Sequence, residues 1–562
     1  MGRATNSRLI FREKRRRRPF TTYTDVNWMK TLFLFLLLAL SVSPTPTYAT
    51  DYYVSASAGS NTNDGKSTAK PFLTIQRAAD LTNPGDTVFV MNGVYRSTSG
   101  PVLNITRSGS ATAWITFKAL KGHSPTMIGS GNVWNTVSIN GSYIQFDGFE
   151  LIGNNANLTY AGALAIYNEA KAGGTNWAAY ANYNTNGISI GGPRDETKFP
   201  HHVTVRNCKV HDFPGGGISS IQADYTTIEN NLVYNNGWYM MYAGSGISIL
   251  TPFNVDKLTT YKNIVRNNVC HTNKTTIPWL SLGRLSDGNG IIIDVNRHSY
   301  SEQDATTPSA NAYTGRTLVA NNLCINNGGS GIHAFKADHV DIINNTACNN
   351  GTVVGYAEIF ANTCDDVSIL NNIMYGRDGG ECNSTNKNTN VVYDYNVYAN
   401  GKVAVKGPND IVADPQFVDR NLDLATGNFT LQATSPAVDK GTNVPGKFSS
   451  ADLLGVPRPQ GSKPDIGAYE YREQISVITA LAEVAEVVRI SPNPVDKVLT
   501  VTNVPGTTGR AELVNCLGQP MMQAPLTGSS TQLDLQKLPG GLYLLLVYSE
   551  GKLITISKVM KQ

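Results

Sequence analysis

Charge, zinc-type cysteine spacing and catalytic signature motifs are all scarce in this 562-residue chain. Only 16% of the residues are Asp, Glu, Lys or Arg. None of the seven cysteines forms a Cys-x-x-Cys pair, which argues against a zinc site. No His-Glu-x-x-His or phosphate-loop motif occurs, so zinc proteases and nucleotide-binding enzymes of those types have no support. Glycine is abundant, with 52 residues, and asparagine is frequent, which suits short strands joined by tight turns.

The apolar run near the N-terminus is too short to cross a membrane. It spans 31–40 as TLFLFLLLAL, with Lys30 before it and the small-residue stretch Thr47-Tyr48-Ala49 after it. This order predicts an N-terminal extension and signal peptide at 1–49, and no transmembrane span in the mature chain. Residues 1–49 hold nine Lys or Arg and two Asp or Glu, so their removal changes the net charge from +4 to −3. That charge argues against nucleic-acid binding.

An Asn-Asn pair recurs along the middle of the chain, and a Gly-Ile phrase usually precedes it. The pairs begin at residues 230, 267, 321, 344 and 371, and the Gly-Ile phrases begin at 187, 217, 246, 290 and 331. The shortest spacings between pairs are 23 and 27 residues, without a helical pattern. A period of this length predicts a stacked β-solenoid. We expect the Asn side chains to bond to one another and to turn backbone, and therefore to be structural.

Alignment on the Asn pairs places two cysteines in one apolar column. Cys270 and Cys324 share this column with Val233, Ala347 and Met374. One interpretation is that both thiols are small hydrophobic groups in the core, and the other is a disulfide between stacked neighbours. The odd number of cysteines leaves at least one thiol unpaired within the chain.

The segment before the repeat resembles the opening of a known group of proteins. It runs from Tyr52 to Tyr95 as YYVSASAGSNTNDGKSTAKPFLTIQRAADLTNPGDTVFVMNGVY. This phrase resembles the start of right-handed parallel β-helix proteins, among them polysaccharide lyases and notably polysaccharide lyase family 9. The resemblance implies an all-β chain built on a pectate-lyase-like solenoid, with the β-helix and its N-terminal cap at 50–390.

Two further resemblances cover the C-terminal part. In 391–472 the motifs DPQFVD, NFTL, SPAVDKG, GVPRP and PDIGAYE follow in order, which resembles the choice-of-anchor Q domain that closes many bacterial β-helix proteins. In that domain Asp439, Asp465 and Glu470 are expected to be structural. A linker is predicted at 473–485.

Residues 486–562 carry ISPNPVDKVLTV and LPGGLYL and resemble the type IX secretion sorting domain, a small C-terminal β-sandwich. This resemblance implies the secretion machinery as a partner. It also implies that the protein is secreted or attached to the outer cell surface of a Gram-negative bacterium.

Three polar residues interrupt the small or apolar positions of the Gly-Ile strands. They are Asp294, and His333 and Lys336 on the next rung; rungs lie about 4.8 Å apart, so these side chains can converge. β-Elimination from a uronic acid needs a base for the proton beside the carboxylate and a cation for the developing charge. Lys336 would be the base and His333 the proton shuttle. Arg297 or His298 would bind the substrate acid group, and Asp294 would orient Lys336 or hold Ca²⁺.

Long insertions beside these strands predict a groove for the substrate. One insertion contains Arg194, and another contains Trp177 and Tyr180, whose rings could stack on sugars. Asp287 begins an Asp-Gly-Asn-Gly sequence, which is typical of calcium loops and of tight turns, so Asp287 and Asp294 are the candidate Ca²⁺ ligands. Family 9 lyases use a Lys base, and this chain departs from that pattern by having Asp294 at the matching strand.

We predict a secreted polysaccharide lyase that acts on an acidic glycan. A glycoside hydrolase is the alternative, since Asp294 and Glu358 lie two rungs apart and such enzymes use paired carboxylates. Asp224, Asp338 and Asp365 recur at equivalent turns and are expected to be structural. A non-catalytic adhesin or glycan-binding protein is the third alternative, because the fold alone cannot choose. The expected partners are a polysaccharide and the secretion machinery, and the chain is expected to be a monomer.

Overall fold

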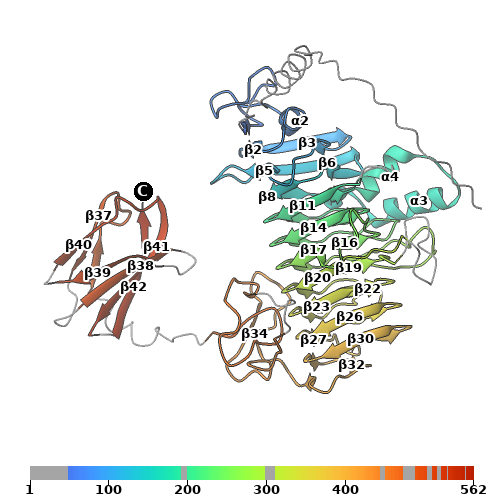
Figure 1. Cartoon of the computed structure of the whole chain (residues 1–562). Coiled ribbons are helices and arrows are strands. Elements are labelled where there is room, and N and C mark those ends of the chain that lie inside the picture. Colours follow the sequence, from blue (N-terminus) through green and yellow to red (C-terminus); the bar gives the residue numbers. More distant parts are fainter. Residues whose placement is uncertain are drawn as a thin grey trace, which may run out of the picture. The chain divides into compact units, whose positions relative to one another are not determined.

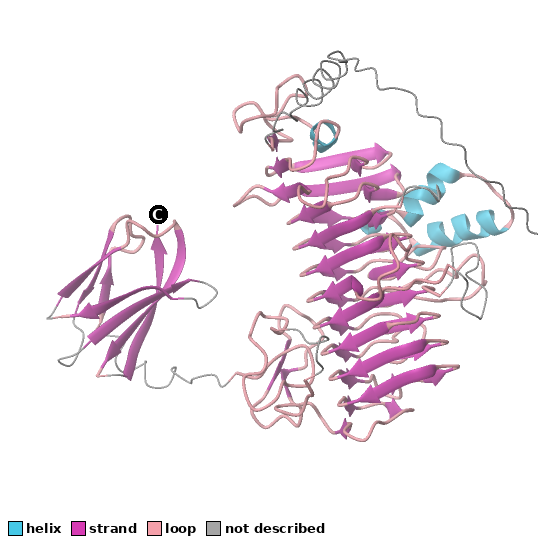
Figure 2. Cartoon of the chain, viewed as in Figure 1, coloured by secondary structure: helices cyan, strands magenta, loops and turns pink. Residues whose placement is uncertain are grey.

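Short parallel strands stacked rung upon rung form the body of the protein. The computed structural model describes residues 49–191, 199–297, 311–443, 450–472, 488–502, 509–515, 520–527, 530–550 and 552–561. The predicted signal peptide, Ala49 aside, and the predicted linker at 473–485 lie outside these residues. The contacts divide the chain into two compact units, 1–470 and 471–562. Figure 1 shows the repeating rungs of the first unit, and Figure 2 shows that strands greatly outnumber helices.

Three parallel sheets form the β-helix of the first unit. Sheet A contains, in spatial order, β1 (Asp51–Val54), β2 (Thr87–Val90), β5 (Ile115–Ala119), β8 (Ile144–Asp147), β11 (His201–Arg206), β14 (Asp224–Glu229), β17 (Tyr261–Arg266), β20 (Arg316–Ala320), β23 (Val340–Ile343), β26 (Asp365–Leu370) and β30 (Thr389–Asp394). Sheet B contains β3 (Val94–Ser99), β6 (Thr126–Asn132), β9 (Glu150–Ile152), β12 (Lys209–His211), β15 (Leu232–Tyr234), β18 (Val269–His271), β21 (Leu323–Ile325), β24 (Thr346–Cys348), β27 (Ile373–Tyr375), β31 (Val397–Ala399) and β33 (Ile411–Val412). Sheet C contains β4 (Leu103–Ile105), β7 (Asn135–Ile139), β10 (Asn186–Ile190), β13 (Ile218–Ile221), β16 (Ile247–Leu250), β19 (Ile291–Asp294), β22 (Ile332–Phe335), β25 (Ile359–Asn362) and β29 (Thr385–Asn386). Each full rung gives one strand to each sheet, so the predicted right-handed parallel β-helix is confirmed.

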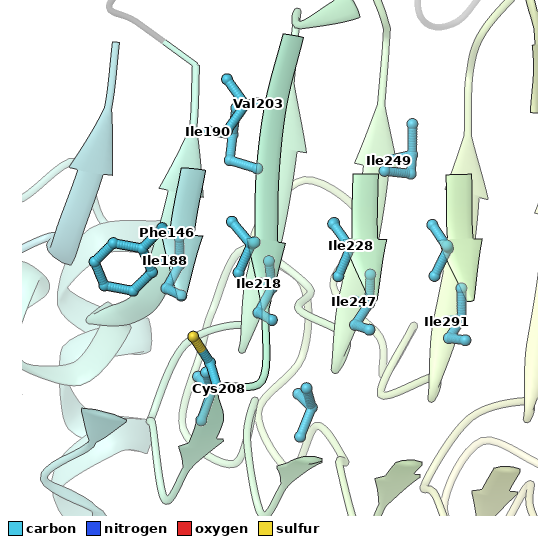
Figure 3. Close-up of a cluster of buried hydrophobic side chains, with 14 of the residues drawn as sticks. Phe146, Ile188, Ile190, Val203, Cys208, Ile218, Ile228, Ile247, Ile249 and Ile291 are labelled. Atoms are coloured by element: carbon cyan, nitrogen blue, oxygen red, sulfur yellow. The ribbon is translucent and has the colours of Figure 1, made fainter. Parts of the chain in front are cut away.

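The core of the β-helix follows from strand alternation. The first residue of the Gly-Ile strands points inward, and Ile188, Ile218, Ile247 and Ile291 form one buried column, as Figure 3 shows. The register of sheet B aligns Val233, Cys270, Cys324, Ala347 and Met374, and all five are buried. The predicted core column is therefore confirmed. The six described cysteines are free thiols, so the disulfide interpretation is not what the structure shows.

The second Asn of each pair forms a ladder of side-chain amides along the turn between sheets A and B. Asn231 donates from its backbone N and its Nδ2 to Asn268 Oδ1, and Asn268 donates in the same way to Asn322 Oδ1. The pattern continues through Asn345, Asn372 and Asn396 and ends on the carboxylate of Asp410. The first Asn of each pair adopts a left-handed conformation, with φ between 53° and 56°, which Asn tolerates well. The structural role predicted for the pairs is confirmed.

A second amide ladder lies five residues further on, at the turn between sheets B and C. It runs through Asn236, Asn273, Asn327 and Asn350 with the same hydrogen-bond pattern, and it ends on Glu358. This ladder was not predicted, although the Asn recurs at a constant offset from each pair. Because both ladders satisfy buried backbone groups on either side of sheet B, they fix its three-residue strands in register.

The first unit is covered at its N-terminal end by α2 (Ile75–Ala79). Thr74 caps this helix, and Ile75, Ala78 and Ala79 are buried. Gln76 exchanges two hydrogen bonds with the backbone of Asn104 in β4. Three more helices, η1 (Asn155–Asn157), α3 (Tyr160–Lys171) and α4 (Trp177–Asn184), are inserted between β9 and β10. No helix of the described residues is long and apolar enough to cross a membrane.

The end of the first unit packs back against the β-helix. It includes the paired strands β28 (Glu381–Asn383) and β32 (Lys402–Val403), and β34 (Phe417–Asp419) and β35 (Asn428–Leu431). The first Asn of three pairs donates from its side chain to this segment, to the carbonyl oxygens of Ala451, Asp465 and Thr442.

Buried ionic contacts hold the same segment together. Glu470 pairs with Arg458 at 2.6 Å, and both side chains are fully buried. Glu470 also accepts from Asp465 N, and the Asp465 side chain accepts from Asp439 N. Asp439 in turn accepts from Lys463 N. The structural roles expected for Asp439, Asp465 and Glu470 agree with these contacts.

The second unit is a small antiparallel β-sandwich. One sheet contains β36 (Arg489–Ser491), β37 (Val498–Thr502) and β40 (Ser530–Asp534). The other contains β39 (Pro520–Leu526), β38 (Gly509–Asn515), β41 (Gly541–Ser549) and β42 (Lys552–Lys561). Both sheets contribute buried side chains to one core, among them Leu499, Leu533, Leu513, Leu545 and Val559. This confirms the predicted C-terminal sandwich.

Candidate active site

The size of the side chains on the outer face of sheet C increases along the β-helix. The residue after the inward Ile is Ser189, Ser219 and Ser248 on three successive strands, and these side chains point outward. On the next three strands the same position holds the larger Ile292, His333 and Phe360. Small side chains therefore leave room above β10, β13 and β16, and bulky ones fill it from β22 onward.

A groove of about 590 Å³ occupies this space. Its floor includes the three serines, and Asn135 and Asn186 add amide groups at one end. The rings of Trp134 and Tyr242 form part of its wall, with centroids 6.1 Å apart. A second cavity, of about 200 Å³ beside the N-terminal cap, has no acidic side chain among its lining residues.

Insertions from three places in the sequence build the wall of the groove. Buried residues of α3, α4 and the loops after β15 and β18 form one apolar cluster, namely Ala163, Tyr167, Tyr180, Met241 and Ile277. Figure 1 shows α3 and α4 beside the upper rungs. Of the insertions predicted to border a groove, those ending at Asn184 and containing Asp287 contribute lining residues, and the greater part of the insertions after β10 and β19 lies outside the described residues.

Two acidic side chains line the groove. Asp294, at the end of β19, points outward and lines it together with Asp287 from the preceding loop. Burial raises the pKa of Asp294 to about 8; the Asp287 charge adds to this shift, and Lys336 opposes it. Asp294 Oδ1 is buried and has no hydrogen-bond partner among the described residues. Asp294 is thus a carboxylic acid that keeps its proton at neutral pH.

Asp287 is held in place by its own loop. It has a left-handed backbone with φ of 63°, and Gly288 follows with φ of 71°. Ser286 Oγ donates to Asp287 Oδ2 at 2.8 Å. Burial also raises the pKa of Asp287. The groove therefore holds two carboxyl groups whose pKa values are both raised by burial.

The predicted base and proton shuttle lie one rung further on and do not line the groove. Lys336 is half-buried, with Nζ 5.5 Å from the centroid of the Phe335 ring. His333 is buried and stacks on Phe360 at 4.0 Å, and neither ring nitrogen has a hydrogen-bond partner among the described residues. Burial lowers the pKa of His333 to about 3, so the ring stays neutral. The predicted set of Lys336 and His333 around the substrate is therefore not assembled in the groove.

The predicted substrate-binding cation has another partner. Arg297 is 7% exposed and forms a buried ion pair with Asp338. Asp338 also accepts from Asp365 N, so it joins two turns as expected of a structural residue. The assignment of Arg297 to a substrate carboxylate is corrected accordingly, because breaking a buried ion pair is strongly unfavourable. His298 and Arg194 lie outside the described residues.

The rings predicted to stack on sugars are placed differently from expectation. Tyr180 is 1% exposed and belongs to the cluster behind the groove wall, so it cannot contact a substrate. Trp177, at the start of α4, is 58% exposed and packs edge-on against Tyr180 at 5.4 Å. Neither ring lines the groove, whereas Trp134 and Tyr242 do.

The carboxylate pair proposed for a hydrolase is also corrected. Glu358 is 1% exposed and accepts from the backbone N and the side chain of Asn350, so it is the end of the second amide ladder. It is not a groove residue. Asp287, and not Glu358, lines the groove together with Asp294.

One further sequence motif lies in the groove. Ser189 is the central residue of the string Gly-Ile-Ser-Ile-Gly, which matches a motif of serine hydrolases. That motif requires a sharp strand-to-helix turn, and Ser189 lies inside the parallel strand β10 instead. Its part here is to keep the groove floor small and polar.

The predicted calcium site at Asp287 and Asp294 stays a prediction. These two acidic residues line the same groove, and calcium takes six to eight oxygen ligands. Among the described residues no group of three or more Asp, Glu, His or Cys side chains could hold a metal ion.

Comparisons with known proteins support the architecture. Residues 135–307 match the family model of the right-handed β-helix region, and residues 489–562 match that of the secretion system C-terminal sorting domain. The sorting domain makes the type IX secretion machinery a partner of this chain. The protein is therefore secreted or attached to the outer cell surface, as predicted. No curated protein matches the sequence.

Several solved β-helix structures are similar at low identity. The pectate lyase Pel9A is 18% identical, with 75% of this chain and 96% of that chain covered and a TM-score of 0.43. The complex of XylC with xylose is 13% identical, with 75% and 98% covered and a TM-score of 0.42. The GH136 lacto-N-biosidase from Eubacterium ramulus is 16% identical, with 67% and 60% covered and a TM-score of 0.39.

Proposed function

We propose that this protein is a secreted glycoside hydrolase that cleaves a neutral glycan in the groove on sheet C. The observation that carries the proposal is the pair formed by Asp294 and Asp287. Asp294 holds a proton at neutral pH because its pKa is raised to about 8, and Asp287 lies in the same groove. Two carboxyl groups on either side of a glycosidic bond are what most glycoside hydrolases use.

In this mechanism Asp294 is the general acid. Its proton passes to the glycosidic oxygen as the bond between that oxygen and the anomeric carbon breaks. Asp287, as the carboxylate, either removes a proton from the attacking water or attacks the anomeric carbon itself, and water completes the reaction. The balance is one water consumed for one glycosidic bond broken.

The lining of the groove favours an uncharged substrate. Its described lining residues include neither Lys nor Arg to pair with an anionic polymer, and the ionised carboxylate of Asp287 would repel one. Ser and Asn side chains supply hydrogen bonds that suit sugar hydroxyls. Trp134 and Tyr242 supply the aromatic surface that sugar-binding sites combine with such groups.

A panel of neutral and acidic polysaccharides tests the proposal. We expect new reducing ends from a neutral glycan, without the ultraviolet absorption of an unsaturated uronate. Unsaturated products from an acidic glycan would contradict the hydrolase. Binding without any product would instead mark the protein as the glycan-binding module considered above.

The pH dependence of kcat/KM should follow the two carboxyl groups. Because Asp294 must be protonated to act, activity is expected to fall as the pH rises through about 8. Because Asp287 must be ionised and its pKa is raised, activity should also fall on the acid side at a higher pH than an ordinary Asp would give. A pH–rate profile on the glycan found in the panel measures both limbs. A profile flat from pH 6 to 10 would contradict the alkaline limb, and an acid limb at the ordinary pKa of Asp would contradict the other.

A polysaccharide lyase with Lys336 as its base is the second candidate. The position of Lys336 favours it, because the ammonium group is near enough to Asp294 to act on its pKa. This candidate also carries the predicted resemblance to family 9 lyases and the predicted calcium requirement. The choice-of-anchor Q assignment of 391–472 likewise stays a prediction.

Lys336→Ala separates the two candidates. A lyase would lose its base and its activity. In the hydrolase, removal of a charge that lowers the pKa of Asp294 should move the alkaline limb of the pH profile upward, with activity at neutral pH largely kept.

A further inference from the structure

We infer that the groove accepts the end of a glycan chain and releases a short unit from it, rather than cutting inside the chain. The inference rests on the proposed hydrolase. Register pairing places Phe335 of β22 beside Asp294, and His333 beside Ile292. Asp294 and Ile292 line the groove, and no β22 residue does. The groove therefore ends at the rung of the general acid, against the next rung at β22.

A packed cluster of aromatic rings closes this end of the groove. His333 stacks on Phe360 at 4.0 Å, and its centroid is 5.7 Å from those of both Phe335 and Tyr356. Tyr356 also contacts Phe360 edge-on at 5.9 Å. His333 and Phe360 are buried, so the cluster is held by the β-helix itself. We call these four residues the ring wall.

The ring wall also reaches the loop of the second carboxylate. The Tyr356 hydroxyl lies close enough to Ser286 and Asp287 for both to act on its pKa, which burial raises. Ser286 holds Asp287 through a hydrogen bond. The wall therefore borders both catalytic carboxyl groups on the same side.

On the other side of Asp294 the groove is long. Its lining continues from β19 through β16, β13 and β10 to Asn135 of β7. Four strand spacings correspond to about 19 Å, and one spacing is close to the length of a sugar unit. A glycan along the β-helix axis would thus have several binding positions on the β7 side and little room beyond Asp294. This asymmetry fits removal of a terminal unit.

Defined oligosaccharides test the inference on the full-length chain. We use end-labelled hexasaccharides of β-1,4-linked xylose, glucose, mannose and galactose, and we analyse the first products by chromatography. One initial pair of products is expected from the sugar that is cleaved. Several initial pairs that disappear in Asp294→Asn would overturn the inference and leave the hydrolase standing. No cleavage of these or of any polysaccharide would overturn both.

Blocked substrates give a test that needs no variant of the wall. A bulky fluorophore on the terminus that enters the ring wall should prevent cleavage, and the same group on the other terminus should be tolerated. Equal cleavage of both blocked hexasaccharides would overturn the inference.

Removal of the wall should open the groove. Phe335→Ala with Tyr356→Ala, two rings that are only half-buried, is expected to add new initial product pairs. Tyr53→Ala, which removes a half-buried ring in the N-terminal cap, is the matched control and should keep the single pair. An unchanged single pair in the folded double variant would overturn the role of the ring wall.

Discussion

Asp294→Asn is expected to lower kcat/KM for glycan hydrolysis about a thousandfold, which corresponds to ~4 kcal/mol of transition-state stabilisation. The amide keeps the size and shape of the side chain but cannot give a carboxylic proton to the leaving oxygen. The fold should persist, because Asp294 Oδ1 makes no hydrogen bond to the described residues that the change would remove. Initial rates on the glycan identified in the panel measure the loss.

Two further Asp→Asn variants make this result specific. Asp287→Asn should also be close to inactive, because hydrolysis needs the second carboxylate to activate water or to attack. Asp64→Asn, at an exposed position of the N-terminal cap, should retain the wild-type rate. If Asp294→Asn were as active as Asp64→Asn, Asp294 could not be the general acid.

Asn231→Ala is expected to lower the free energy of unfolding of the β-helix by about 4 kcal/mol. Asn231 Oδ1 accepts from Cys208 N, and its Nδ2 donates to Val205 O and to Asn268 Oδ1. Alanine leaves these buried groups without their side-chain partner, and each unsatisfied buried group costs about 1–3 kcal/mol. Urea unfolding followed by circular dichroism measures the change.

The neighbouring residue provides the control. Asn230 is exposed and adopts φ of 56°, so Asn230→Ala should cost only about 1 kcal/mol of left-handed backbone strain. Asn230→Gly should remove that strain as well. Equal losses in Asn230→Ala and Asn231→Ala would show that the amide ladder is not the source of stability.

The fold could be predicted because its determinants repeat along the sequence. A β-helix places each Asn of a ladder directly above the next, so the same residue must return in every rung, and the spacing of the pairs reports the rung length. The column of Cys270 and Cys324 was predicted for the same reason. The second ladder repeats with the same spacing, so the same reasoning could have predicted it.

The site could be predicted only where it interrupts the repeat. Asp294 was found because a carboxylate replaces the Leu250 of the preceding rung in the same column. Trp134 and Tyr242 were missed, and Asp287 was predicted only as a calcium ligand with Asp294. These residues come from turns and insertions whose packing has no period.

The sequence also does not show which residues form ion pairs or which inserted residues are buried. Arg297 and Asp338 are 41 residues apart, and nothing local shows that each is the partner of the other. Tyr180 looks like a sugar-stacking ring until the packing of α3 and α4 buries it. A polar or aromatic residue in an insertion is therefore a candidate whose role tertiary structure decides.

The amide ladder along Asn231 has a direction, and this has a consequence for how long the β-helix can be. Every Asn in it accepts hydrogen bonds from the rung before and donates hydrogen bonds to the rung after. The same pattern could therefore continue over any number of rungs. Asp410 receives four hydrogen bonds, from Asn396 N and Nδ2, Tyr398 Oη and Gly407 N, and a carboxylate has no proton to pass on. The Asp410 side chain therefore ends the ladder. Extra rungs could thus be spliced in before Asn396 by repeating the Asn-bearing unit, whereas growth beyond Asp410 would first require its exchange for Asn.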